Sequence, residues 1–292
     1  MTYAHHGSVD IYFETFGDPA NPALLNVNGL GGQCISFDED LCESFVDRGL
    51  FVIRFDNRDV GLSTKFDDVT PRVADVLRAL RDGTAPTVAY RLSDMANDAV
   101  AVLDALGVNR AHVAGASLGG MIVQQLAIDH PERLRSMISI MSTTGDPDVG
   151  KPSHDAWARF NTRPATDRAS YIQNQVDLYR VVGSPEFFDS DYVAARAGAA
   201  FDRCFCPWGR ARQYCASLAS GSRSAGLRAV RVPALVVHGD QDTLIDISGG
   251  RRTAECIPGA RFVAIEGMGH DYPRALRPQL VELIAGHAAA NL

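Results

Sequence analysis

A serine flanked by glycines is the clearest candidate for a reactive residue in this sequence. Gly115-Ala116-Ser117-Leu118-Gly119 fits the pattern G-x-S-x-G, in which a strand turns abruptly into a helix with the serine at the strained apex. Glycine is needed beside the apex because larger side chains would collide with the neighbouring strand and helix. At the helix start, backbone N–H groups and the helix dipole favour a developing negative charge. Ser117 is therefore the candidate nucleophile.

The surroundings of this motif strengthen the prediction. Residues 110–114 form a strand-like apolar run and residues 121–128 have a helix-like pattern, which is the context that the motif requires. Two other glycine-rich interpretations fail. Neither Gly115–Gly120 nor Gly29–Gly32 spells the dinucleotide-binding pattern G-x-G-x-x-G, and no Lys-Ser or Lys-Thr pair follows to make a phosphate-binding loop.

A serine hydroxyl is a weak nucleophile and needs a base, usually a histidine, which in turn needs an orienting carboxylate. Five histidines follow Ser117 in the chain: His130, His154, His238, His270 and His287. His270 follows the strand-like run 261–265 within Glu266-Gly267-Met268-Gly269-His270. We expect the flexible glycines of this loop to let the imidazole swing over the sheet, which makes His270 the candidate base.

The candidate carboxylates follow another apolar run. Residues 234–238 end in Gly239-Asp240-Gln241-Asp242, and parallel sheets place active sites beyond the carboxyl ends of their strands. Asp240 and Asp242 are both candidates, and either preserves the chain order Ser, Asp, His that this type of site shows. The residues alone favour loop hydrogen bonds for Asp240.

An ester carbonyl that is attacked by serine becomes an oxyanion, which two backbone N–H groups usually stabilise. One donor is expected to be Leu118, which directly follows the nucleophile. The other is expected from Asn28-Gly29-Leu30-Gly31-Gly32, hereafter the oxyanion loop, where glycines let the backbone approach a substrate oxygen. A plain glycine turn is the alternative interpretation of this segment.

These residues must be positioned by strands and helices that alternate along the chain. Short apolar runs bounded by Gly, Pro, Asn or Asp predict buried parallel strands, at residues 11–16, 23–27, 51–55, 111–114, 137–141, 234–237 and 261–265. Amphipathic segments between them predict helices, at residues 73–81, 93–106, 118–130 and 278–289. This alternation predicts an α/β fold with a parallel sheet and helices on both faces.

The alternation stops between residues 143 and 228. That segment of 86 residues holds 11 of the 23 aromatic residues, including both tryptophans, and no convincing strand. We expect a core domain made of residues 1–142 and 229–292, with residues 143–228 inserted as a helical cap over the site. A plain helical subdomain with its own core is the alternative.

Composition restricts the class of protein further. The chain has 292 residues and a net charge of −7, which disfavours nucleic acid as a partner because phosphate neutralisation needs clustered Lys and Arg. No apolar stretch is long enough to span a membrane, and no secretory signal is evident. The six cysteines are expected to be reduced packing residues. We therefore expect a cytoplasmic protein without a metal or cofactor, with its oligomeric state, a homodimer included, left open.

Taken together, these motifs resemble the α/β-hydrolase superfamily over nearly the whole chain. Asn28-Gly29-Leu30 stands where the family often has His-Gly-x, which implies Leu30 as the second oxyanion donor. Residues 232–242 resemble the family's seventh strand and acid loop, which selects Asp242 over Asp240. Asp56-Asn57-Arg58-Asp59-Val60-Gly61-Leu62-Ser63 resembles the family segment D-x-R-G-x-G-x-S, with Asp59 in place of glycine.

That replacement, together with Gly267-Met268-Gly269-His270, resembles the bacterial subgroup that contains aclacinomycin methylesterase. The resemblance implies an eight-stranded, mostly parallel sheet and a helical cap inserted after the sixth strand. It also implies a serine hydrolase acting on carboxylic esters of hydrophobic small molecules, methyl esters included. Thioesterase, C–C bond hydrolase and cofactor-free perhydrolase activities are alternatives on the same residues. A ligand receptor on a hydrolase scaffold is the alternative outside enzymes.

Overall fold

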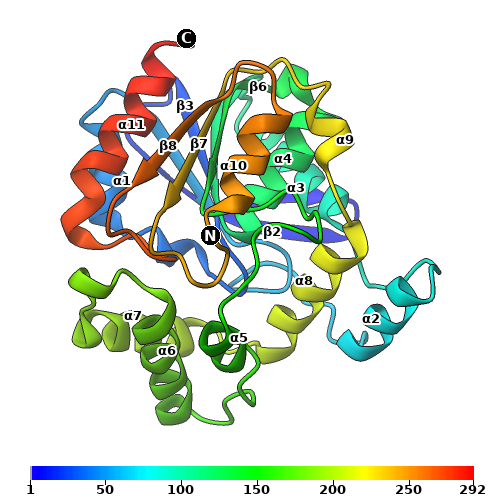
Figure 1. Ribbon diagram of the computed structural model, residues 1–292. Coiled ribbons are helices and arrows are strands. Elements are labelled where there is room, and N and C mark those ends of the chain that lie inside the picture. The colour runs from blue at the N-terminus through cyan, green and yellow to red at the C-terminus, as the bar shows by residue number, and fades with distance from the viewer. Residues whose placement is uncertain (1) are drawn as a thin grey trace.

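An eight-stranded sheet forms the centre of the computed structural model, which describes residues 2–292 (Figure 1). Its strands follow the spatial order β1-β2-β4-β3-β5-β6-β7-β8. The first two pairs in this order, β1 with β2 and β2 with β4, are antiparallel, and every later pair is parallel. The strands are β1 Thr2–His6, β2 Val9–Phe16, β3 Ala23–Val27, β4 Phe51–Phe55, β5 Ala111–Ala116, β6 Leu134–Ile140, β7 Ala234–Gly239 and β8 Arg261–Ile265.

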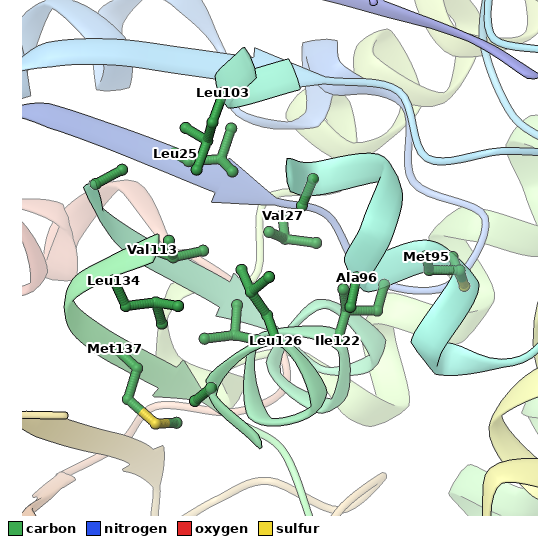
Figure 2. Close-up of a cluster of buried hydrophobic side chains, with 14 of the residues drawn as sticks. Leu25, Val27, Met95, Ala96, Leu103, Val113, Ile122, Leu126, Leu134 and Met137 are labelled. Atoms are coloured by element: carbon green, nitrogen blue, oxygen red, sulfur yellow. The ribbon is translucent and has the colours of Figure 1, made fainter. Parts of the chain in front are cut away.

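Helices cover both faces of this sheet because successive side chains of a strand point to opposite faces. Leu25 of β3 belongs to a core shared with α3 (Leu92–Ala105), α4 (Leu118–Asp129) and α10 (Ser248–Cys256). Figure 2 shows the part of this core that β3, β5 and β6 share with α3 and α4. The adjacent residue, Leu24, packs in the opposite core with α1 (Glu39–Val46) and α11 (Arg277–Ala289). Both cores contain side chains that are fully buried.

Five α-helices separate β6 from β7 along the chain. They are α5 His154–Phe160, α6 Arg168–Val182, α7 Ser190–Arg203, α8 Pro207–Ser220 and α9 Ser224–Leu227. In Figure 1, α5, α6 and α7 gather beyond one end of the sheet and α8 leads from them back to the core. The remaining helix, α2 Val73–Arg81, packs against α8. Within residues 2–292 no strand occurs between Ile140 and Ala234, where the sequence predicts the insertion.

No helix in the part of the chain that the structure describes combines the length and the apolar character needed to cross a membrane.

Candidate active site

The turn between β5 and α4 places Ser117 in a strained backbone conformation. Its φ is +55° and its ψ is −120°, a region that non-glycine residues rarely occupy and that costs about 1–3 kcal/mol. A Cβ atom at Gly115 would lie 2.3 Å from the Gly119 carbonyl oxygen, and one at Gly119 would lie 2.0 Å from the Val27 carbonyl oxygen. These two glycines therefore permit the turn by close approach, as the motif predicts.

Hydrogen bonds from the end of β6 hold this turn in place. The Ser117 N–H donates to the Ile140 carbonyl at 2.9 Å, and the Ser142 hydroxyl donates to the Ser117 carbonyl at 2.8 Å. Because α4 begins at Leu118, the Leu118 N–H lies in the first turn, where donors lack partners within the helix. The turn thus presents a hydroxyl and a backbone donor at the carboxyl edge of the sheet.

Asp242 and His270 form a buried pair at the same edge. The His270 Nδ1 and Asp242 Oδ2 atoms are 2.7 Å apart. The other carboxylate oxygen, Oδ1, accepts hydrogen bonds from the N–H groups of Leu244 and Ile245, both at 2.9 Å. Burial raises the pKa of Asp242, but the charge of His270 and the hydrogen bonds from His238 and His270 outweigh it and lower the pKa to about 2. Asp242 is therefore an anion held in a fixed orientation toward the imidazole.

Asp240 has a different partner, although it lies only two residues away. It is exposed, and its Oδ1 atom accepts a hydrogen bond from the Gly267 N–H at 2.8 Å. This contact closes the turns that follow β7 and β8 against each other. The geometry agrees with the assignment of Asp242 to the imidazole and of Asp240 to a loop hydrogen bond.

The loop that carries His270 is tied to the end of α6. The His270 N–H donates to the Val182 carbonyl at 2.6 Å, and the Gly269 N–H donates to the Ser184 hydroxyl at 2.9 Å. Asp271 completes the tie by accepting from the Ser184 N–H and hydroxyl at 3.0 and 2.6 Å.

Gly269 in this loop has a different role from the one that the sequence predicts. A Cβ atom at Gly269 would lie 2.4 Å from the Gly183 carbonyl carbon. Gly269 therefore allows close packing against the chain that follows α6. The sequence predicts that this loop can swing, whereas in the structure hydrogen bonds hold it against the end of α6.

Ser117 and His270 line one cavity of about 1470 Å³ together with Leu30 and Leu118. Within residues 2–292 His270 is the only one of the five candidate histidines to line it. The structure records no hydrogen bond between the Ser117 hydroxyl and His270 in the part of the chain that it describes. Such bonds are often long in unliganded enzymes and tighten with substrate. That Ser117, His270 and Asp242 act together as a catalytic triad stays a prediction.

The oxyanion loop is fixed by side chains from two other segments. The Gly31 N–H donates to Gln213 Oε1 at 2.9 Å, and Gln213 Nε2 donates to the Arg58 carbonyl at 2.8 Å. Asn57 Nδ2 donates to the Asn28 carbonyl at 3.0 Å. Among residues 2–292 the Leu30 and Leu118 N–H groups have no acceptor in the protein, which leaves both free for a substrate oxygen.

Sequence reasoning missed two supporting residues of the site, Gln213 and His238. Gln213 is fully buried on α8 and reaches a loop 182 residues away. His238 donates from Nε2 to the Ile245 carbonyl at 2.8 Å, and the same atom lies 3.4 Å from Asp242 Oδ2. The position of His238 at the end of β7, four residues before Asp242, is the one signal in the sequence that could have indicated its role.

Aromatic side chains form much of the cavity wall. Ten of the eleven aromatic residues in segment 143–228 line it, the exception being Phe201. Trp157 stacks on Phe160, whose ring meets Tyr214 edge-on. A wall of this kind favours an apolar or aromatic ligand. In the described residues no group of three or more His, Cys, Asp or Glu side chains could hold a metal ion.

The family model described as "alpha/beta hydrolase fold" matches residues 22–272 of the chain. Two relatives from Streptomyces are similar over nearly their whole length. Rhodomycin D methylesterase DauP of Streptomyces sp. (strain C5) is 30% identical and rhodomycin D methylesterase DnrP of Streptomyces peucetius is 31% identical. Each alignment covers 97% of this chain and 96% of the relative. These similarities agree with the predicted resemblance to bacterial methylesterases.

Among solved structures, the meta-cleavage product hydrolase from Pseudomonas fluorescens IP01 superposes with a TM-score of 0.78. The superposition covers 99% of this chain and 98% of that one at 15% sequence identity. A likeness at this identity concerns the fold, and it confirms the predicted arrangement of an eight-stranded, mostly parallel sheet with helices on both faces.

Proposed function

The chain belongs to the α/β-hydrolase family, and from this premise we propose that it hydrolyses carboxylic esters of hydrophobic small molecules, methyl esters included. The observation that carries the proposal is the His270–Asp242 pair, at 2.7 Å, in a cavity that Ser117 also lines. The names of the two Streptomyces relatives support ester cleavage, because both are methylesterases.

The proposed reaction proceeds through an acyl-enzyme on Ser117. The Ser117 oxygen attacks the ester carbonyl while His270 Nε2 takes the hydroxyl proton. The Leu30 and Leu118 N–H groups stabilise the oxyanion. His270 then gives its proton to the leaving alcohol, and the C–O bond of the ester breaks.

Water completes the cycle. His270 takes a proton from a water molecule, which attacks the acyl carbon. The bond between that carbon and the Ser117 oxygen then breaks, and His270 returns the proton to Ser117 as the acid leaves. Asp242 stabilises the imidazolium in both halves and keeps Nδ1 protonated, so that Nε2 faces the substrate.

The proposal assigns segment 143–228 as a cap that shapes the substrate cavity. Its aromatic wall supports an apolar or aromatic acyl or alcohol group. A cytoplasmic location stays a prediction of the sequence.

The proposal is tested by assaying p-nitrophenyl acetate and a panel of aromatic methyl esters with the protein and with Ser117→Ala. We expect turnover that Ser117→Ala abolishes, and a serine-directed phosphonate that labels Ser117 in mass spectrometry. Labelling of another residue would contradict the assigned nucleophile. Stoichiometric ligand binding without turnover of any ester would favour a receptor, and turnover of thioesters alone would favour a thioesterase.

A further inference from the structure

Arg210 on α8 lines the cavity next to the oxyanion loop. A Cβ atom at Gly31 would lie 3.3 Å from the Cβ, Cγ and Cδ atoms of Arg210, so the aliphatic stem of the arginine packs directly on that glycine. Gly31 follows Leu30, the predicted oxyanion donor. Arg210 therefore leaves α8 close to the point where the ester group would bind.

The guanidinium of Arg210 has an aromatic partner but no anionic one. Its Cζ atom lies 4.4 Å from the centre of the Phe160 ring, and its single hydrogen bond, from Nη2 to the Phe160 carbonyl, is long at 3.4 Å. No Asp or Glu in residues 2–292 forms an ion pair with it. Burial lowers its pKa, and the nearby hydroxyls of Tyr171 and Tyr214 only partly oppose this effect. Arg210 is half-buried, and partial removal of a charge from water without a partner costs free energy.

Two arginines near Arg210 in the sequence, unlike Arg210, form ion pairs with buried carboxylates. Arg203, seven residues earlier, pairs with buried Asp56 at 2.8 Å, and Arg212, two residues later, pairs with buried Asp59 at 2.8 Å. The loop after β4 thus provides carboxylates for the arginines on either side of Arg210 and none for Arg210 itself.

The other cations that line the cavity are also accounted for in the described residues. Lys151, Arg159, Arg163 and Arg274 are exposed and can be hydrated by solvent.

The other buried or half-buried cations of the cavity wall have protein acceptors. Arg223 donates to Gln124 Oε1 at 3.0 Å and to the carbonyls of Thr143 and Gly221 at 2.8 and 3.1 Å. Arg54 pairs with Glu14, and Arg196 donates to the Ser36 carbonyl at 2.6 Å. Among the buried and half-buried cations of the cavity wall in the described residues, half-buried Arg210 is the one whose only polar contact is a single long hydrogen bond.

We propose that Arg210 binds a carboxylate carried by the substrate, in addition to the ester that is cleaved. Apart from the long bond to the Phe160 carbonyl, the N–H groups of this guanidinium have no acceptor among the described residues. The planar edge of a guanidinium matches a carboxylate with two parallel hydrogen bonds. The substrate class is therefore an aromatic ester with a second, negatively charged end. This inference rests on the proposed ester hydrolysis and specifies its substrate.

The test compares esters that differ in charge but not in shape. Three methyl esters of aromatic acids carry a carboxylate at the far end of a benzene, naphthalene or biphenyl frame, which places the charge progressively further from the ester. Each is paired with its neutral carboxamide. For at least one frame we expect kcat/KM of the carboxylate ester to exceed that of its carboxamide by about tenfold or more, since hydrogen bonds to charged groups contribute at that level.

Variants then connect this preference to Arg210. Arg210→Met and Arg210→Gln should lose it, Arg210→Lys should keep part of it, and Arg163→Met, at an exposed position of the same cavity, should retain it. Two neutral variants and one charged variant keep the test usable if one of them does not fold. A wild-type protein without preference on any frame, or a preference that survives Arg210→Met, would overturn the proposal.

Binding separates a failure of this inference from a failure of the proposed activity. Calorimetric titration of the same esters into Ser117→Ala protein requires no turnover. Tighter binding of the carboxylate ester, lost in Ser117→Ala/Arg210→Met, supports the inference even if no ester is hydrolysed. If Arg210→Met instead relieves inhibition by benzoate, and the charged and neutral esters bind equally, Arg210 holds the product acid and the inference is wrong.

Discussion

At the scale of single residues, the site depends on the difference between two aspartates in one turn. Asp242 faces the imidazole of His270, whereas Asp240 accepts from a backbone N–H in the neighbouring turn. An amide at position 242 could donate to Nδ1 and would stabilise the wrong tautomer of the histidine.

Asp242→Asn is therefore expected to lower kcat for ester hydrolysis by up to about 10⁴-fold. Asp240→Asn is the matched control, because it makes the same change in charge and size within the same turn. Steady-state kinetics on one aromatic ester should show a small effect for the control. A larger loss in Asp240→Asn than in Asp242→Asn would mean that the assigned acid is the wrong one.

The same carboxylate should contribute to stability in a defined pH range. The pKa of Asp242 is lowered in the folded protein from 3.8 to about 2. A carboxylate with a lowered folded-state pKa stabilises the fold above its unfolded pKa, and this contribution is lost as pH falls toward the folded pKa. The two values correspond to about 2 kcal/mol that disappears between pH 4 and pH 2.

Urea unfolding of the wild type and of Asp242→Asn at several pH values measures this contribution. The free energy of unfolding of the wild type should fall more steeply between pH 4 and pH 2 than that of the variant. Parallel curves over that interval would show that the pKa of Asp242 is not lowered by folding.

At the scale of elements, helix α8 supports the oxyanion loop through a single side chain. Gln213 accepts from the Gly31 N–H and donates to the Arg58 carbonyl, so it joins the oxyanion loop to the segment that follows β4. It is a positioning residue, since it acts on the Leu30 N–H only through the loop.

Gln213→Met keeps the length of the side chain and removes both hydrogen bonds. We expect kcat to fall by about tenfold to a hundredfold with a smaller change in KM, because the displaced donor acts in the transition state. Ser217→Ala, one turn later on the same helix, is the control, because its hydroxyl donates to the Tyr214 carbonyl of its own helix. A change in KM alone would contradict a role in placing the oxyanion donor.

The core elements were predictable because their patterns are local. Predicted strands at 23–27, 51–55 and 261–265 match β3, β4 and β8, and the predicted helix 73–81 matches α2, since each is a short apolar or amphipathic run with clear ends. Strand β1 was not predicted because it lies at the sheet edge, where only Ala4 of Thr2–His6 is buried.

Some residues of the candidate site could also be predicted from the sequence, and others could not. Ser117 and His270 stand in glycine-rich turns directly after strands, so their sequence neighbours indicate them. Gln213 and Arg210 could not be identified, because their importance comes from contacts with the distant oxyanion loop. The choice between Asp240 and Asp242 required the family resemblance, since both follow the same strand.

At the scale of the whole molecule, buried ion pairs join the predicted cap to the core. Asp59, with φ of +73°, binds Arg212 of α8 through both carboxylate oxygens at 2.8 and 2.9 Å and accepts from the Tyr90 hydroxyl at 2.6 Å. Asp56 pairs with Arg203 at the end of α7. Both aspartates belong to the segment after β4, so one loop holds α7 and α8 of the predicted cap.

Weakening this connection should let the cap unfold before the core. Asp59→Asn removes one charge of a buried pair, and asparagine tolerates positive φ, so the variant is expected to lose about 3 kcal/mol of unfolding free energy. Because Trp157 and Trp208 both lie in segment 143–228, tryptophan fluorescence reports the cap and far-ultraviolet circular dichroism reports the whole chain. In urea the two signals should coincide for the wild type, whereas fluorescence should change at lower urea in Asp59→Asn.

Asp67→Asn, which removes an exposed partner of Arg212, is the control and should shift neither signal by more than about 0.5 kcal/mol. Coincident transitions in Asp59→Asn at the wild-type midpoint would show that this ion pair does not hold the cap to the core.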